Sequence, residues 1–153
     1  MDTFFLNELK SCCVDINGDR ENAGGISRVL GAYRRIMDFS ELARKEGLLA
    51  LCDACDKLDK SDRTQGFLFR LMMQVVDGYE PAVVSEMGLN MLAADEYHAY
   101  EGLIVLMYYK GACLIQTGVS IDRLGSYMQS LMPQFLREIL QKKEEERSED
   151  DYI

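Results

Sequence analysis

Five cysteines are the residues with the clearest chemical potential: Cys12, Cys13, Cys52, Cys55 and Cys113. Cys52 and Cys55 form a Cys-x-x-Cys pair, to which Cys12 and Cys13 could add two thiolates for a tetrahedral zinc ion. A zinc-binding pair usually lies in a turn, whereas Cys52 and Cys55 continue an apolar stripe with helical spacing. Because cysteine packs readily as a small apolar side chain, we expect five reduced thiols without a bound metal.

Residues 15–26 imitate a calcium-binding loop, with oxygen-bearing side chains at the first, third, fifth and seventh positions. In such a loop the sixth residue is glycine and the twelfth is glutamate. Here these positions hold Arg20 and Ile26. We therefore expect a polar loop between two helices and no calcium site.

His98 is the only histidine of the chain, and carboxylates flank it in the segment 95–101. General acid–base catalysis would also need a nucleophile or a phosphate-binding loop beside it, and the sequence offers neither. An enzyme that uses Cys52, Cys55 or His98 is therefore our third and least favoured hypothesis. We expect no catalytic residue and no cofactor.

A cluster of charged side chains is the stronger candidate for a functional site. It consists of Arg34, Arg35, Arg44, Lys45 and Glu46, on a chain whose net charge is −9. Basic side chains grouped on an acidic protein steer an acidic partner toward them. We predict partner binding at these five residues. The competing interpretation is a set of solvated helix faces.

Two segments of the chain carry a family resemblance. The first is Ala43-Arg44-Lys45-Glu46-Gly47-Leu48-Leu49-Ala50-Leu51, and the second is Val75-Val76-Asp77-Gly78-Tyr79-Glu80-Pro81. Together they resemble the cytoplasmic part of the flagellar motor stator A subunit (MotA, of the MotA/TolQ/ExbB family). In that family an Arg-x-x-Gly-Leu-Leu-Ala-Leu helix precedes a helix that ends Val-Val-Asp-Gly-x-x-Pro. The resemblance covers about residues 39 to 95.

The resemblance implies a partner and a role for one residue. In the stator family, the helix with the Arg-x-x-Gly motif meets oppositely charged residues of a rotor protein, and Arg44 matches that arginine. The family commonly has a glutamate directly after Leu-Leu-Ala-Leu, whereas this chain has Cys52. A flagellar rotor or stator component is therefore the partner that the resemblance implies.

Membrane helices form the ion path of a stator, and the sequence lacks a convincing one. The best candidate, 102–118, has Lys110 at its centre and barely reaches spanning length. It also lacks the proline that the third membrane helix of the family typically carries. We therefore expect neither membrane insertion nor ion conduction.

The composition is that of a soluble globular protein, with 48% apolar and 28% charged residues. The negative net charge disfavours nucleic acid and anionic membranes, because both bind clustered Lys and Arg. The N-terminal residues have no basic region ahead of an apolar one, so we expect no secretory signal and a cytoplasmic location.

Helical periodicity is the main signal along the chain, and no segment alternates as a strand does. We predict helices at about residues 4–14, 26–37, 39–58, 68–76, 81–92, 103–109, 121–131 and 133–140. The predicted fold is all-α, a compact bundle of about six to eight helices. Residues 1–141 form a single helical domain, and we expect 142–153, which are dense in charge, to be a disordered tail.

Local signals mark several of the helix boundaries. Asp38 is a candidate N-cap for the helix that begins at residue 39. Gly78 can close one helix in the left-handed conformation, and Pro81 suits the first turn of the next. Gly118 indicates a break, after which Ser120 caps another helix.

The sequence therefore predicts a cytoplasmic helical protein-binding module that resembles the rotor-facing part of a flagellar stator and has no ion-channel activity. The alternative is a helical scaffold or oligomerisation protein unrelated to motility. Assembly into a homo-oligomer is compatible with both.

Overall fold

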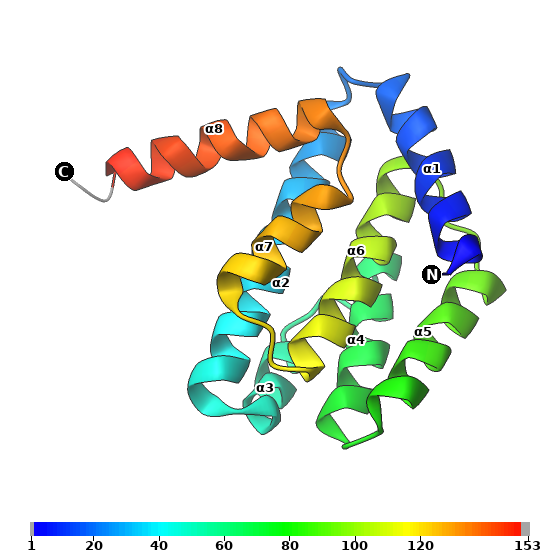
Figure 1. Cartoon of the computed structure of the whole chain (residues 1–153), viewed down its shortest axis with the longest axis vertical. Helices are drawn as coiled ribbons and strands as arrows, with labels where there is room; N and C mark the ends of the chain where they lie inside the picture. The colour runs from blue at the N-terminus through cyan, green and yellow to red at the C-terminus, as the bar shows by residue number, and fades with distance from the viewer. Residues whose placement is uncertain (1, 151–153) are drawn as a thin grey trace.

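The computed structural model describes residues 2–150, and all the regular structure in this part of the chain is helical (Figure 1). Its eight α-helices confirm the predicted all-α bundle. The helices are α1 (Thr3–Asn17), α2 (Ala23–Glu46), α3 (Leu51–Asp56), α4 (Arg63–Val76), α5 (Pro81–Ala94), α6 (Ala99–Gln116), α7 (Ile121–Ser130) and α8 (Gln134–Asp150), and a 3-10 turn, η1 (Leu48–Ala50), precedes α3.

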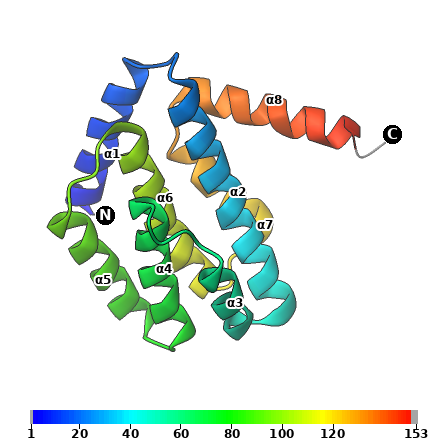
Figure 2. The same cartoon turned by 180° about the vertical axis from the view of Figure 1, so that it is seen from behind.

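The helix α6 lies at the centre of the bundle, and α1, α2, α4, α5 and α7 pack around it (Figures 1 and 2). Every residue from 102 to 109 is buried. These residues are apolar or aromatic on all sides of the helix, and such a helix is stable only when its neighbours enclose it. The other helices therefore form a shell around α6.

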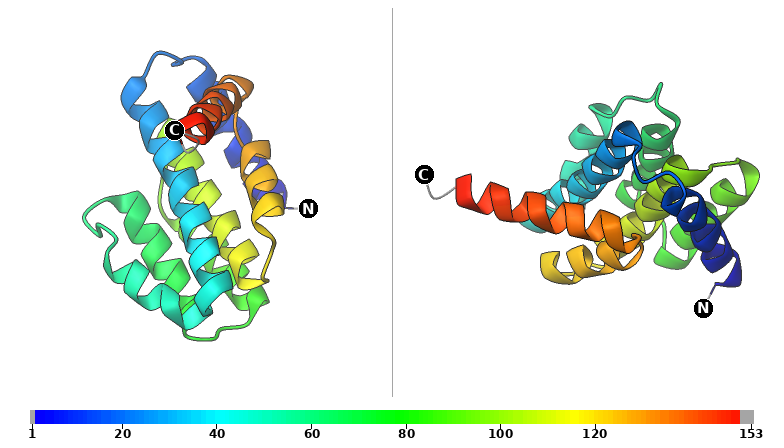
Figure 3. Two further views of the ribbon diagram at one scale, coloured as in Figure 1. Left: turned by 90° about the vertical axis from the view of Figure 1, so that its left-hand side faces the viewer. Right: turned by 90° about the horizontal axis from the view of Figure 1, so that it is seen from above.

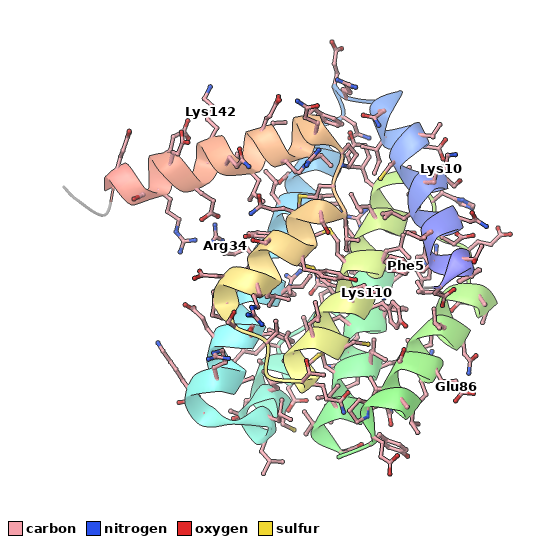
Figure 4. All side chains as sticks on the ribbon, in the orientation of Figure 1. Phe5, Lys10, Arg34, Glu86, Lys110 and Lys142 are labelled. Atoms are coloured by element: carbon pink, nitrogen blue, oxygen red, sulfur yellow. The ribbon has the colours of Figure 1, made fainter. Side chains whose placement is uncertain are left out.

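Lys110 directly follows the buried segment of α6. Its ammonium lies 4.7 Å from the centroid of the Phe5 ring on α1, a cation–π contact that Figure 4 shows between the two helices. The charge is therefore accommodated at the edge of the core. Within residues 2–150, no helix has the length and apolar character needed to cross a membrane.

Three tyrosine hydroxyls of α6 find partners in the surrounding shell. Tyr100 donates to the carbonyl oxygen of Asp19 at 2.6 Å, in the loop between α1 and α2. The hydroxyl of Tyr108 accepts a hydrogen bond from Arg35 on α2 at 2.9 Å. Tyr109 shares a hydrogen bond with Ser85 on α5, also at 2.9 Å. Since a buried hydroxyl without a partner is costly, these bonds fix which elements can lie where.

Two of these tyrosine rings rest directly on glycines of neighbouring helices. A Cβ added at Gly25 would lie 2.6 Å from the Tyr100 ring, and one at Gly88 would lie 2.4 Å from the Tyr109 ring. Both distances are far below ordinary contact. The absence of a side chain at these positions lets α2 and α5 approach α6 closely.

The helix boundaries at Gly78 and Gly118 are those that the sequence predicts. Gly78 has φ 85° and closes α4, and Pro81 is the first residue of α5. Gly118 has φ 77° and follows α6, and the Ser120 hydroxyl then accepts a hydrogen bond from the Arg123 N–H at 3.3 Å. Positive φ is the conformation for which glycine has no steric cost.

The predicted boundary at Asp38 is wrong, because α2 continues through it to Glu46. Asp38 is an exposed residue inside the helix, and the buried side chains Val29, Ile36 and Phe39 lie on one uninterrupted face. The real break is at Gly47, which has φ 89°. The predicted helix at 39–58 is therefore divided between the end of α2, η1 and α3.

The C-terminal part also differs from the prediction of a disordered tail. Residues 142–150 continue α8, which leaves the body of the bundle at a steep angle (Figure 3). Its first half is anchored in the core through buried Leu136 and Leu140. Glu, Lys and Arg are strong helix formers, so dense charge does not by itself end a helix. The last predicted tail residues, 151–153, lie outside the described part.

We predict that Gly88→Ala and Gly31→Ala will shift stability in opposite directions. At Gly88 the new methyl group overlaps Tyr109, and overpacking of this kind costs about 1–3 kcal/mol. Alanine is the better helix former by roughly 1 kcal/mol, which offsets part of this cost. We expect urea denaturation to show a net loss of up to about 2 kcal/mol for Gly88→Ala.

Gly31→Ala is the matched control, because Gly31 is exposed inside α2 and no atom lies within 4 Å of the added Cβ. It should gain about 0.5–1 kcal/mol of unfolding free energy. Equal shifts for the two variants would show that the Gly88–Tyr109 contact does not limit the packing.

Candidate partner-binding groove

An open groove of about 730 Å³ lies between the second half of α2 and α3. Figure 2 shows the two helices side by side at one edge of the bundle. The floor is apolar and the rim is charged. Floor residues are Phe39, Leu42, Ala50, Ala54 and Leu58, and rim residues are Arg34, Arg35, Asp38, Glu46, Asp53 and Lys57.

The direction of α3 follows from the turn at Gly47. Ala50 comes just after the end of α2, so the start of α3 lies beside Glu46. At the other end, the N–H of Asp59 donates to the Gln65 side chain at 2.9 Å, and Gln65 lines a smaller hollow together with Arg35. α3 therefore runs back along α2, antiparallel to it.

Arg35 joins the groove to the core. Its guanidinium donates to the hydroxyl of Tyr108, which is buried on α6. Burial raises the pKa of Tyr108, although Arg35 acts to lower it, so the phenol stays protonated and neutral near pH 7. In the described part of the chain, no carboxylate lies within 4 Å of Arg35. Arg35 is thus available at the rim for a carboxylate of a partner.

Arg34 lies on the boundary between two hollows. It lines the groove and also a second hollow of about 350 Å³ between α2, α7 and α8. There it forms an ion pair with Glu144 of α8. In Figure 4, Arg34 lies beneath α8. One side chain therefore contacts the groove and holds the projecting helix.

The structure separates the predicted five-residue cluster into parts. Arg34, Arg35 and Glu46 line the groove, whereas Arg44 lies on another side of α2. Ten residues of helix place Arg34 and Arg44 about 15 Å apart along the axis. Lys45 is exposed in the last turn of α2, and it lines neither the groove nor the hollow beside Arg44.

Arg44 is exposed but makes contacts within the chain. Its Nη1 donates to the carbonyl oxygens of Gly118 and Val119, at 3.0 and 3.2 Å. These carbonyls follow the C-terminus of α6, where a cation interacts favourably with the helix dipole. The arginine that matches the stator motif therefore fastens α2 to the end of α6.

Several groove residues were absent from the predicted cluster. Asp38, Asp53 and Lys57 supply half of the rim charges. The signal for Asp38 was its spacing, because residues 35, 38, 42 and 46 recur at intervals of three and four and share one face of a helix. Asp53 and Lys57 could be placed only once the direction of α3 was known.

Two of the five cysteines lie in the core, and the other three are partly exposed. Cys12 and Cys55 are buried, and Cys52 is half-buried. Burial raises the pKa of Cys12 and Cys55 to about 11. Among residues 2–150, no three His, Cys, Asp or Glu side chains are grouped so that they could hold a metal ion. His98 is exposed ahead of α6, with its Nε2 3.7 Å from the Glu96 carboxylate.

Comparisons with protein-family models, with curated proteins and with solved structures find no match to this chain. The stator resemblance therefore rests on the two sequence motifs. In the structure, the first motif forms the end of α2, the turn at Gly47 and the start of α3, and the second forms the boundary between α4 and α5.

We predict that Arg44→Glu will destabilise the fold more than Lys45→Glu. Both positions lie in the last turn of α2, so loss of the favourable cation at that helix end is common to both variants. Only Arg44 also donates to the carbonyls after α6. The difference in unfolding free energy should be about 1 kcal/mol, measured by urea denaturation. Equal losses would contradict a fastening role for Arg44.

We also predict that thiol labelling will distinguish Cys52 from Cys55 in the native protein. At pH 8, a pKa of about 11 leaves roughly one Cys55 thiol in a thousand ionised. Cys55 and Cys12 should resist iodoacetamide until the chain unfolds, and half-buried Cys52 should react first. The measurement is peptide mass spectrometry over time. Rapid native labelling of Cys55 would contradict its burial.

The free energy of unfolding should fall as pH rises from about 9 through 11, because the unfolded chain releases the thiol protons of Cys12 and Cys55 more readily than the folded chain does.

Proposed function

We propose that this chain is a protein-binding module and that its binding surface is the groove between α2 and α3. The observation that carries the proposal is an apolar floor, open to solvent, beneath a rim of charges that internal ion pairs mostly leave free. Apolar surface with oriented polar groups is typical of binding sites. None of the residues that line the groove is a histidine, cysteine or serine, which favours binding over catalysis.

The partner we propose is a flagellar rotor or stator component in the cytoplasm. The support is the stator-like motif at residues 43–51, which forms the turn that places α3 against α2. Charged groups of a rotor-facing surface would come from Arg34, Arg35 and Glu46 at the groove, with Lys45 exposed nearby. Ion conduction is not part of this proposal.

A helical scaffold or oligomerisation protein remains the second candidate function. One observation favours it: α1 exposes several large apolar side chains, with Val14 62%, Leu6 42% and Phe4 37% exposed. Apolar side chains on one helix are available for contact with a second copy. Sedimentation of the purified chain tests the oligomerisation protein, because a strictly monomeric chain would contradict it.

We predict that Arg35→Glu will lose the native partner while Arg137→Glu retains it. Arg35 lies at the groove rim, and Arg137 is an exposed arginine on α8 outside the groove. The two variants change net charge equally. Reversal of a rim charge should weaken binding about tenfold or more, measured by quantitative mass spectrometry of proteins that the immobilised variants retain from native cytosol.

Circular dichroism of both variants is the folding control, because Arg35→Glu also removes the bond to Tyr108. Recovery of a flagellar protein that depends on Arg35 supports the proposal. A partner retained equally by both variants would place the binding surface elsewhere, and self-association alone would favour the scaffold.

A further inference from the structure

The charges on the groove rim are segregated along its length. On the α2 wall, Arg34 and Arg35 lie near one end and Glu46 lies at the other. Because α3 runs antiparallel to α2, Asp53 faces the end with Glu46, and Lys57 faces the end with Arg35. Both walls therefore give the groove a cationic end and an anionic end.

Most of these charges are free to meet a partner. Within residues 2–150, Arg35, Glu46, Asp53 and Lys57 form no ion pair at 4 Å or less. Arg34 is the exception, since it contacts Glu144. Asp38, about one turn from Arg34, adds a carboxylate toward the middle of the rim. The two ends of the groove still carry charges of opposite sign.

The size and floor of the groove fit a helix. Along α2 the lining runs from Gly31 to Glu46, which is about 22 Å, or four helical turns. The walls are helices whose backbone groups are already paired, so they offer no edge to an extended peptide. An extended segment on this apolar floor would leave its own N–H and C=O groups without partners. A helix satisfies those groups internally and presents an apolar stripe instead.

We propose that the groove binds an amphipathic helix of the partner, oriented parallel to α2, with acidic first turns at the Arg35–Lys57 end and basic last turns at the Glu46–Asp53 end. This rests on the proposed function of the groove in protein binding. Helices favour acidic residues in the first turn and basic residues in the last, because of the helix dipole. In the opposite orientation such a helix would place like charges together, which is strongly disfavoured.

Two synthetic peptides of the same composition test the orientation. Each has about 16 residues, enough to span the groove, with leucines at helical spacing on one face. The acid-first peptide has glutamates in its first turn and lysines in its last, and the base-first peptide has them exchanged. A side-chain staple holds both in the helical state, so helix propensity does not separate them. Fluorescence anisotropy measures their dissociation constants at low and high salt.

The protein variant is Asp53→Lys with Lys57→Glu, which reverses the two rim charges on the α3 side of the groove and leaves the net charge unchanged. Both side chains are exposed. Retained thermal unfolding and circular dichroism show that the variant is folded. The single variant Glu46→Lys, on α2, provides an independent test of the anionic end if the double variant is unstable.

The parent protein should bind the acid-first peptide about tenfold more tightly at low salt, a difference of about 1.4 kcal/mol. High salt should reduce the preference because rim charges are screened, and the exchanged variant should narrow it to below about threefold. Equal binding of both peptides would overturn the orientation while leaving the groove as a binding site. Binding of neither peptide would overturn both the orientation and the function proposed for the groove.

Discussion

The hydroxyl groups of three tyrosines on an otherwise apolar central helix are the constraint from which the arrangement of the bundle follows. α6 has to be enclosed because water cannot solvate it favourably on any side. Enclosure alone would allow many arrangements of the shell. The hydroxyls restrict these arrangements, because each hydrogen bond requires one particular element beside its tyrosine. These elements are the α1–α2 loop for Tyr100, α2 for Tyr108 and α5 for Tyr109. Apolar burial supplies the stability, and hydrogen bonding supplies the specificity.

The candidate site is a by-product of the same constraint. α2 contributes one face to α6, and the 24 residues of this helix extend well beyond the region that α6 can cover. The face that lines the groove meets η1 and the short helix α3, whose small residues, Ala50 in η1 and Ala54 in α3, leave space above the floor. The bond from Arg35 to Tyr108 then connects this open face to the core. A rim charge is thereby positioned by a buried residue of the central helix.

Local signals in the sequence were sufficient for much of the fold and for little of the site. Gly78, Pro81 and Ser120 could be interpreted because each acts within one or two turns of its own position. Asp38 could not be interpreted in this way, because aspartate caps helices but is also tolerated on an exposed helix face. The groove was out of reach for a different reason. Whether Arg44 lies on the same side of α2 as Arg34 depends on the helix continuing without a break past Asp38. Which residues of α3 line the groove depends on the direction that the chain takes after the turn at Gly47.

The ion pair between Arg34 and Glu144 connects the groove to α8, which otherwise has few attachments to the bundle. A ligand carboxylate that displaced Glu144 from Arg34 would weaken the hold on α8. Thermodynamic reciprocity would then require the converse by the same factor: whatever secures α8 in place would lower the affinity of the groove for that ligand. In that case a single side chain would couple the position of the projecting helix to the occupancy of the groove.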